Sequence, residues 1–420
     1  MMVVLVNIGL LNLNNMKMSV IIYCLIGLSL WGCKEKDCPT PPKGGEDNSM
    51  AIVWSKKLPA EKTASRTVVF DELVIIGQEA PVGYEIMAFN KITGDSVWSF
   101  NINPTGSFWP KEIENFFLES DKLVLSSGRS YYVLKAQTGE IIWGERMEEA
   151  ENDACAIDGF LYKADEIAKS TTTLFRFDIN TGAKEELFTI TKGDYNTGTY
   201  SPGLLLPVKW TSPVGDEILV LQNRTFNWAG VGQQEPADAD RMDILGYNLT
   251  ADTMLWYRNG IAKISSMATP AIDGNKVYFY GGSKVHCIDP ANGEDIWEFQ
   301  VGGSNSLEFV GSNILLHNDM LIAKPDSRAM YALDKETGQQ IWYNPATMSS
   351  PSAMTIESDT VYFTGYYLNG VDVNTGELVV QYESPESRSF FHGVGINPDN
   401  GYVYASDGKY LYCLDPKFMK

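Results

Sequence analysis

Short apolar runs alternate with polar positions along most of this chain, and turn-forming residues separate the runs. The stretch 267–301 shows the pattern best, with strands predicted at 268–272, 276–280, 285–289 and 295–301. Asp273-Gly274 and Gly281-Gly282 lie between these runs, and such pairs favour tight hairpins because Gly adopts a positive φ at no steric cost. The stretch therefore predicts four antiparallel strands in succession.

The same four-strand unit recurs, and one phrase marks each copy. In its best form, AMYALDKETGQQIW at 329–342, a small residue is followed by Asp two positions later, by Gly four after that, and by Trp four after the Gly. Counted at the Gly position, the copies lie about 40 residues apart, except for an interval of 70 that ends at Asp252. This period, with four strands per unit, is typical of a β-propeller in which each repeat forms one blade.

Counting the copies predicts an all-β, eight-bladed propeller of four-stranded antiparallel blades. Seven units contain both the third and the fourth strand, and an eighth phrase, LYCLDPKFMK, ends the chain before its Gly and Trp. The missing fourth strand is predicted at 51–58, where AIVW supplies a Trp with no phrase ahead of it. Pairing 51–58 with 410–415 would close the ring and leave no free sheet edge. A seven-bladed ring is the alternative.

Each fixed position of the phrase has a structural reason. Asp can accept hydrogen bonds from backbone amides of the turn, Gly supplies the left-handed residue, and Trp covers the seam to a neighbouring blade. Two copies are degenerate: Glu186 stands in one Trp slot and Asp252 in one Gly slot, and Val380 replaces a further Trp. The predicted docking residues are Trp54, Gly94, Trp98, Gly139, Trp143, Gly182, Trp256, Gly293, Trp297, Gly338, Trp342 and Gly376.

The spacing A-x-D-x-x-x-G-x-x-x-W resembles the tryptophan-docking motif of the pyrroloquinoline-quinone (PQQ) dehydrogenase propellers and of the PQQ-like repeat family named after them. The resemblance covers nearly all of 51–415. Together with the N-terminal features below, the chain looks most like the outer-membrane assembly-factor lipoproteins of the BamB type. That likeness implies a non-enzyme with protein partners in outer-membrane assembly, whereas the dehydrogenases imply PQQ and calcium.

The N-terminus is predicted to be a targeting segment. A short basic start at Met16-Lys17-Met18, an apolar run at 19–30 and Leu30-Trp31-Gly32-Cys33 indicate a signal peptide over 1–32, with 1–15 an extension ahead of a better start. The ending resembles a bacterial lipobox, which implies lipidation of Cys33; an uncleaved anchor is the alternative. Residues 34–37, KEKD, resemble the tag of surface lipoproteins in Bacteroidetes-type bacteria, and 33–50 has the composition of a flexible tether ahead of one domain at 51–420.

Charge and histidine content exclude some functions. The net charge of -20 argues against nucleic acid as a partner, since phosphate backbones are bound by clustered Lys and Arg. Three histidines, none near another in sequence, leave little for a histidine-based metal or acid–base site. We therefore expect no metal site and no nucleic-acid partner.

The connections differ between the two ends of the predicted ring. Turns from the first to the second strand and from the third to the fourth share one end and are short. The irregular segments at 101–114, 191–202, 223–243 and 383–392 share the other end. Long connections on a rigid scaffold often carry function. The candidate ligand-binding residues there are Phe108, Trp109, Tyr195, Tyr200, Phe226, Trp228, Phe390, Phe391 and His392, although these aromatic residues could equally fill the channel or pack the loops.

Catalytic chemistry finds little support. The PQQ dehydrogenases carry adjacent cysteines, a Trp floor and a calcium set of Asp, Glu and Asn, and this chain has no adjacent cysteines. Asp238, Asp240 and Asp243 lack the EF-hand spacing and predict a solvated acidic loop rather than a calcium site. Cys287 and Cys413 occupy the small-residue slot of the phrase in non-adjacent blades, so no disulfide is expected between them.

The sequence thus predicts a non-catalytic outer-membrane lipoprotein, on the periplasmic or the cell-surface side, that binds a protein or polypeptide partner with its loop-rich end. Neither a cofactor nor catalytic residues are expected, and membrane contact is expected through the lipid anchor only. The alternatives are a carbohydrate-binding surface lipoprotein, with a glycan as partner, and a PQQ-dependent oxidoreductase.

Overall fold

Strands of two to eleven residues make up the regular structure in the computed structural model. The described residues are 51–60, 65–79, 84–102, 116–127, 130–146, 154–164, 171–191, 200–227, 241–262, 268–301, 312–325, 329–345, 352–390 and 392–416. All of them belong to one compact unit, Asp47–Lys420. Among them no helix could span a bilayer.

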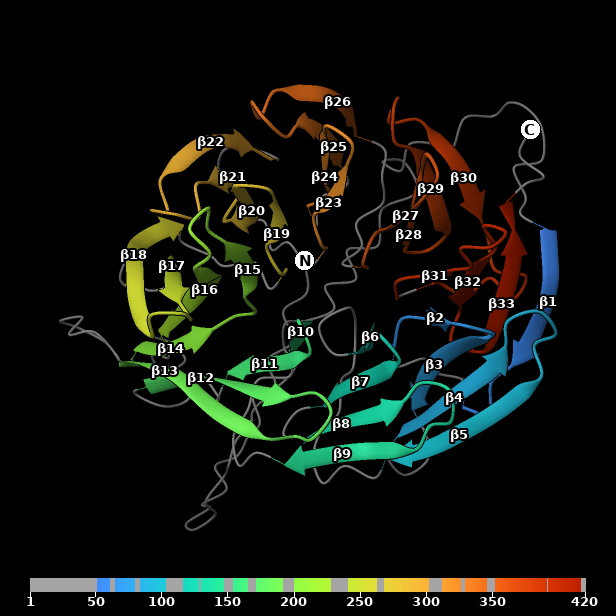
Figure 1. The fold of residues 1–420 in the computed structure, drawn as a ribbon. Helices are drawn as coiled ribbons and strands as arrows, with labels where there is room; N and C mark the ends of the chain where they lie inside the picture. The colour runs from blue at the N-terminus through green and yellow to red at the C-terminus, as the bar shows by residue number, and fades with distance from the viewer. Residues whose placement is uncertain are drawn as a thin grey trace, which may run out of the picture. The chain divides into compact units, whose positions relative to one another are not determined.

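The strands form eight antiparallel sheets, the blades, which follow one another around a ring (Figure 1). Blades 1 to 4 consist of β2 (Val68–Phe70), β3 (Leu73–Glu79), β4 (Tyr84–Asn90) and β5 (Ser96–Ile102); β6 (Phe116–Glu119), β7 (Lys122–Ser127), β8 (Ser130–Lys135) and β9 (Ile141–Arg146); β10 (Cys155–Ile157), β11 (Phe160–Ala164), β12 (Thr171–Asp178) and β13 (Lys184–Thr191); and β14 (Tyr200–Leu204), β15 (Val208–Thr211), β16 (Glu217–Asn227), β17 (Arg241–Asn248) and β18 (Thr253–Ala262).

Blades 5 to 7 consist of β19 (Ala271–Asp273), β20 (Lys276–Gly281), β21 (Lys284–Ile288) and β22 (Asp295–Gln300); β23 (Leu315–His317), β24 (Met320–Ala323), β25 (Met330–Asp334) and β26 (Gln340–Asn344); and β27 (Thr355–Glu357), β28 (Thr360–Thr364), β29 (Leu368–Asp372) and β30 (Leu378–Tyr382). Blade 8 combines β31 (Gly395–Ile396), β32 (Val403–Ser406) and β33 (Tyr410–Asp415) with β1 (Ala51–Lys57).

The first strand completes the last blade, as the sequence predicts. β1 pairs with β33 in antiparallel register, from Ala51 opposite Asp415 to Lys57 opposite Tyr410. Eight blades are therefore confirmed, and the seven-bladed alternative is wrong. Because β1 leads directly into blade 1, the two ends of the described chain are held in one sheet.

The core lies between the blades and closes into a cycle. It divides into eight buried clusters, and each cluster joins two consecutive blades, from blade 1 with blade 2 round to blade 8 with blade 1. In β3, Ile75 packs toward blade 2 while Val74 and Ile76 pack toward blade 8. Alternating residues of a strand serve opposite seams because successive side chains point to opposite faces of the sheet.

Blade 4 departs from the four-strand pattern. Its first strand is broken into β14 and β15, and both pieces pair with the long strand β16. Pro207 lies in the break, where it has no N–H to donate to a ladder. The 70-residue interval in the repeat is therefore used to lengthen this blade: β16 has 11 residues and β18 has 10.

Candidate functional site

The tryptophans of the repeated phrase lie on glycines of the next blade. Trp54 lies against Gly94, and the same relation joins Trp98 to Gly139, Trp143 to Gly182, Trp256 to Gly293, Trp297 to Gly338 and Trp342 to Gly376. A Cβ atom built on Gly376 would lie 2.5 Å from Trp342 Cε3, and Gly376 has a φ of 76°. The position therefore needs Gly for its backbone conformation and for its lack of a side chain.

Five of these six indoles also donate a hydrogen bond across the seam, whereas Trp98 Nε1 has no partner among the described residues. Trp342 Nε1 donates to the carbonyl oxygen of Val373 at 2.7 Å, and Trp297 Nε1 donates to that of Lys335 at 3.1 Å. Trp54, Trp143 and Trp256 donate to the corresponding carbonyls of Lys91, Ile179 and Pro290. These residues hold the ring together and are not aimed at a ligand.

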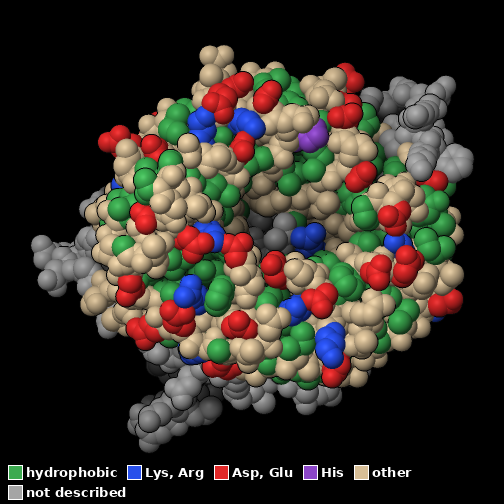
Figure 2. Space-filling model, viewed as in Figure 1, with side chains coloured by type: hydrophobic (Ala, Val, Ile, Leu, Met, Phe, Trp, Pro, Cys, Tyr) green, Lys and Arg blue, Asp and Glu red, His purple; other side chains and the backbone are tan. Residues whose placement is uncertain are grey.

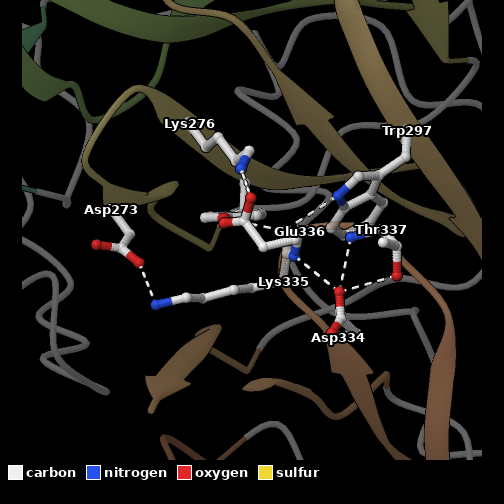
Figure 3. Close-up of polar contacts among 8 residues, drawn as sticks. Asp273, Lys276, Trp297, Asp334, Lys335, Glu336 and Thr337 are labelled. Atoms are coloured by element: carbon white, nitrogen blue, oxygen red, sulfur yellow. Dashed lines mark hydrogen bonds and ion pairs between the residues drawn. The ribbon is translucent and has the colours of Figure 1, made fainter. Parts of the chain in front are cut away.

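The turn that receives the indole is itself fixed by the motif aspartate. Asp334 Oδ1 accepts hydrogen bonds from the backbone N–H groups of Glu336 and Thr337 and from the Thr337 hydroxyl (Figure 3). The Thr337 hydroxyl, followed by the backbone amides, lowers the pKa of Asp334 below its usual range.

Two ion pairs cross the same seam in opposite directions. Lys335 Nζ of blade 6 lies 2.5 Å from Asp273 Oδ2 of blade 5, and Lys276 of blade 5 pairs with Glu336 of blade 6 (Figure 3). The turn from the first to the second strand of each blade lies at this end of the ring, and so does the turn from the third to the fourth strand in blades 1 to 7. We call this end the motif face. The turns of the repeated phrase at this face have a uniform length, and they pack against the Trp residues of the preceding blade.

The seam between blades 3 and 4 is built differently, and the sequence assignment of its Trp slot is wrong. The bulge falls two residues later in β13, and two residues earlier in β12, than at the corresponding positions of blade 1, so Phe188, opposite Leu174, takes the position of the Trp. Phe188 packs on Tyr247 with ring centroids 4.3 Å apart, and Tyr247 donates to the carbonyl oxygen of Leu187. Glu186 is exposed.

A cavity of about 600 Å³ lies among the innermost strands. A hollow is visible at the centre of the ring, with acidic and basic side chains around it (Figure 2). The cavity is lined by Arg66, Thr67, Val68, Val69, Phe117, Leu118, Glu119, Ala154, Cys155, Ala156, Thr269, Thr355, Ile356, Glu357, Val394, Gly395, Ile396 and Pro398.

These lining residues do not fit a quinone site of the dehydrogenase kind. Among the described lining residues there is no Trp for a floor beneath a planar quinone, and the only carboxylates are Glu119 and Glu357, with no Asp or Asn beside them. PQQ carries three carboxylates, and Arg66 is the only Lys or Arg among the described lining residues that could balance their charge. Among the described residues, no group of three His, Cys, Asp or Glu side chains could hold a metal ion.

The opposite end of the ring, the loop-rich face, carries the β3–β4 type turns and the connections between blades. Of the predicted aromatic residues there, Phe108, Trp109, Tyr195, Trp228 and Phe391 lie outside the described residues, as does Cys33. Tyr200 and Phe226 are ladder residues of β14 and β16. His392 is half-buried, and its carbonyl oxygen accepts from Thr364 Oγ1 at 2.9 Å.

Phe390 is not a ligand-facing residue. Its side chain is fully buried in the seam between blades 7 and 8, with ring centroids 6.1 Å from those of Tyr382 and Tyr412. An aromatic residue in a connection fills the core when the connection folds back across a seam, and sequence alone does not separate the two cases. Sequence reasoning missed Tyr366, which is 42% exposed in the β28–β29 turn of this face.

Asp243 was expected in a solvated acidic loop, and that expectation is wrong. It is fully buried in β17, where its carboxylate accepts from Tyr257 Oη at 2.8 Å and from the backbone N–H of Gly260 at 2.7 Å. Asn223, opposite Asp243 in β16, donates to the same Tyr257 oxygen. This network fixes the part of blade 4 that extends toward the loop-rich face. Asp238 and Asp240 lie outside the described residues.

Three cysteines, Cys155, Cys287 and Cys413, lie among the described residues. Cys287 and Cys413 are fully buried, and burial raises the pKa of each to about 12. They pair across the ladder with Trp297 and Trp54, which is the small-residue role predicted from the phrase. Cys155 is half-buried in the wall of the central cavity.

His286 is an unusual buried histidine. Its buried ring stacks on Phe279, with centroids 5.0 Å apart. Burial lowers its pKa. Asp295, which pairs with Arg258 of blade 4, lies 4.0 Å from His286 Nδ1.

Comparison with known proteins agrees with the propeller fold. The chain matches the family model described as outer membrane protein assembly factor BamB over residues 83–312 and again over 240–417. No curated protein sequence matches it.

Many solved structures share this fold, and three of them illustrate the likeness. The crystal structure of BamB from Moraxella catarrhalis has a TM-score of 0.58 at 14% identity, with 87% of this chain and 99% of that chain covered. A europium-containing methanol dehydrogenase has a TM-score of 0.60 at 11% identity, with 85% and 84% covered. The quinohemoprotein alcohol dehydrogenase from Comamonas testosteroni has a TM-score of 0.59 at 10% identity, with 88% and 77% covered. At these identities the likeness shows a shared fold.

Proposed function

The chain belongs to the family described as outer membrane protein assembly factor BamB, and from this membership we propose that it is a non-catalytic scaffold of outer-membrane assembly. In this proposal, Cys33 carries the lipid that anchors the chain to the outer membrane, and the loop-rich face binds a protein or polypeptide partner.

The observation that supports this assignment best is the unequal distribution of irregular structure between the two faces. On the motif face, each Trp, Gly and Asp of the repeat is used in a seam or a turn. On the loop-rich face, blade 4 extends through β14, β16, β17 and β18, and the buried Asp243 network holds that extension rigid. Partner-binding surfaces are commonly carried by variable connections on such a rigid framework.

The composition of the central cavity favours a scaffold over a quinone enzyme. PQQ chemistry requires residues that hold and polarise the cofactor, and the part of the lining that the structure describes has neither the ring floor nor the calcium ligands that the dehydrogenases use. The likeness to the two dehydrogenases extends to the fold, and the repeat itself accounts for that likeness.

Site-specific photo-crosslinking in intact cells tests the proposal. A benzoylphenylalanine at Tyr366, which is exposed on the loop-rich face, should crosslink to a protein of the outer-membrane assembly machinery. The matched control is Val214, which is 85% exposed in the β15–β16 turn of the motif face and should give no such product. Equal crosslinking at both positions, or none at Tyr366 and at the predicted positions Trp109 and Trp228, would contradict a loop-rich binding face.

Two further outcomes would move the chain to another class. A polysaccharide hit on a glycan array that is lost in Trp109→Ala and Trp228→Ala would favour the carbohydrate-binding alternative. Stable uptake of PQQ with calcium, followed by oxidation of an alcohol or a sugar, would make the chain an enzyme.

A further inference from the structure

An apolar patch occurs on the rim of the motif face where blade 8 meets blade 1. It consists of Ile52 and Val53 of β1 and Ile92 in the β4–β5 turn, which are 44%, 43% and 52% exposed. Trp54 brings the two elements together, since it lies on Gly94 of that turn and donates to the carbonyl oxygen of Lys91.

Ile92 is a large apolar residue at a turn position where the other copies of the phrase have a polar or small residue. The equivalent turn position in the other described blades is polar or small and is exposed: Gln137, Asn180, Thr250, Ala291, Glu336 and Asn374. Val53, in contrast, has counterparts around the ring, because the bulged residue before each Trp is aliphatic, as at Val97 and Ile296. A large apolar side chain has therefore been added at the seam where the chain enters the propeller.

The entry point of the chain decides what can cover this patch. β1 begins at Ala51, opposite Asp415, and thus at the motif-face end of blade 8. Seventeen residues separate Ala51 from Cys33. A chain of that length with random-coil statistics has a root-mean-square span of about 20–25 Å. A lipid on Cys33 would hold the patch near the bilayer at a high effective concentration.

We propose that Ile52, Val53 and Ile92 rest on the lipid bilayer and orient the tethered propeller with its motif face toward the membrane. This inference rests on the proposed lipid anchor and adds a protein–membrane contact beyond it. Three side chains are too small a surface to hold the protein on a membrane without a tether, so the patch sets orientation rather than affinity. The loop-rich face then points away from the bilayer, where a soluble domain of a partner can reach it.

The contact is apolar in character. The chain has a net charge of -20, so an anionic surface would repel it. Aliphatic side chains that enter the interfacial region are instead favoured by burial, which salt does not screen. The contact should therefore form on neutral phosphatidylcholine and persist at high salt.

Fluorescence quenching by brominated phosphatidylcholine tests the orientation. An environment-sensitive fluorescent amino acid is placed at Val53, at Ile92, or at Ala291, which is the same exposed turn position in blade 5, and the lipidated protein is reconstituted in vesicles. Quenching at Val53 and Ile92 should exceed that at Ala291 at least three-fold and should change little between 50 mM and 500 mM salt. Equal quenching at the three sites, or none at any, would overturn the proposal, as would a concentration-dependent dimer that buries the patch.

A second arm separates this proposal from the lipid anchor. The chain from Lys34 onward, with a hexahistidine tag in place of Cys33, is bound to vesicles that contain a nickel-chelating lipid. If mass spectrometry shows no lipid on Cys33 in cells, the anchor of the proposed function fails, whereas the quenching difference in this arm still decides whether the patch meets the bilayer. The paired substitution Ile92→Ser with Val53→Ser should reduce the quenching of a probe at Ile52 at least two-fold; unchanged quenching would contradict the contact.

Discussion

Phe188 packs on Tyr247 with ring centroids 4.3 Å apart and replaces the indole–glycine contact at the seam between blades 3 and 4. The seam shows that the repeat conserves a ring on the neighbouring blade rather than a particular residue. The bulge of blade 3 has moved by two positions, and the ring has moved with it.

Replacing Phe188 should therefore destabilise the propeller, whereas replacing the residue in the nominal Trp slot should not. Phe188→Ala removes a half-buried ring and should lower the free energy of unfolding by about 2 kcal/mol. Glu186→Ala, at an exposed position, should change it by less than about 0.5 kcal/mol. Urea unfolding of both variants measures the difference. Equal effects would contradict the assignment of Phe188 to the Trp position of this seam.

Gly94 and Gly159 separate two costs of replacing a left-handed glycine. Both have a positive φ, 72° and 79°, but a Cβ at Gly94 would meet Trp54 at 2.9 Å, whereas nothing lies within 4 Å at Gly159. Gly159→Ala should cost about 1–2 kcal/mol from backbone strain alone. Gly94→Ala should cost at least 1 kcal/mol more, because the Trp54 ring must move and the closing strand moves with it. Thermal unfolding of the pair tests this, and a smaller loss at Gly94 would show that the ring gives way freely.

Much of the fold follows from the sequence because each blade repeats the same local rules. Turn residues, alternation and the Trp spacing set the register of each unit, and the unmatched Trp54 with the unfinished phrase at the C-terminus identifies the closure. The displaced bulge at Phe188 could not be predicted, since a shift of two residues preserves the alternation of side chains.

The candidate site was less predictable for a physical reason. Phe390 and Asp243 lie in segments whose composition resembles that of solvated loops, yet both are buried, and only the tertiary path of the chain decides this. The break of blade 4 had a local signal in Pro207, between two apolar runs. Tyr366 had none beyond its position in a turn.

Stability should fall in mild acid because of His286. Its pKa in the folded protein is lowered from 6.5, chiefly by burial; Asp295 and Glu298 oppose the shift and Lys284 adds to it. The unfolded state therefore binds a proton first, so stability is complete above about pH 6.5 and is lost as the pH falls toward the native pKa. The slope should approach 1.4 kcal/mol per pH unit in that window.

The histidine contribution is isolated by comparison with His286→Phe and His286→Gln. Both variants should lose less stability between pH 7 and pH 5 than the parent chain, because neither side chain titrates there. Chemical unfolding at several pH values gives the difference profile. Parallel profiles for the three proteins would assign the acid sensitivity to other groups.

The three described thiols should differ in reactivity. Cys287 and Cys413 are buried and their thiol pKa is raised to about 12, so the thiolate is scarce and inaccessible at pH 8. Iodoacetamide should modify the half-buried Cys155 within the time in which these two remain unmodified, and denaturant should equalise the three. Peptide mass spectrometry reads the result. Early modification of Cys413 would indicate that β1 opens from β33.

Asp243 should control the order of the blade 4 extension more than the stability of the whole ring. Its carboxylate accepts hydrogen bonds from Tyr257 and from the N–H of Gly260, whose φ is 66°, across a bulge in the β17–β18 ladder. Asp243→Ala removes the buried carboxylate that accepts both of these part-buried hydrogen bonds, at a cost of about 1–3 kcal/mol. Tyr257→Phe removes one of the donors and should cost about 1 kcal/mol.

Because the Asp243 network lies at the end of β18, the loss of stability in Asp243→Ala should appear first as local opening of that strand. Hydrogen exchange of peptides within 254–262 should accelerate at least ten-fold in Asp243→Ala, while β22 peptides at 295–300 stay protected. Uniform acceleration across both strands would instead make Asp243 part of the global core, and the extension would then not be a separately ordered platform for a partner.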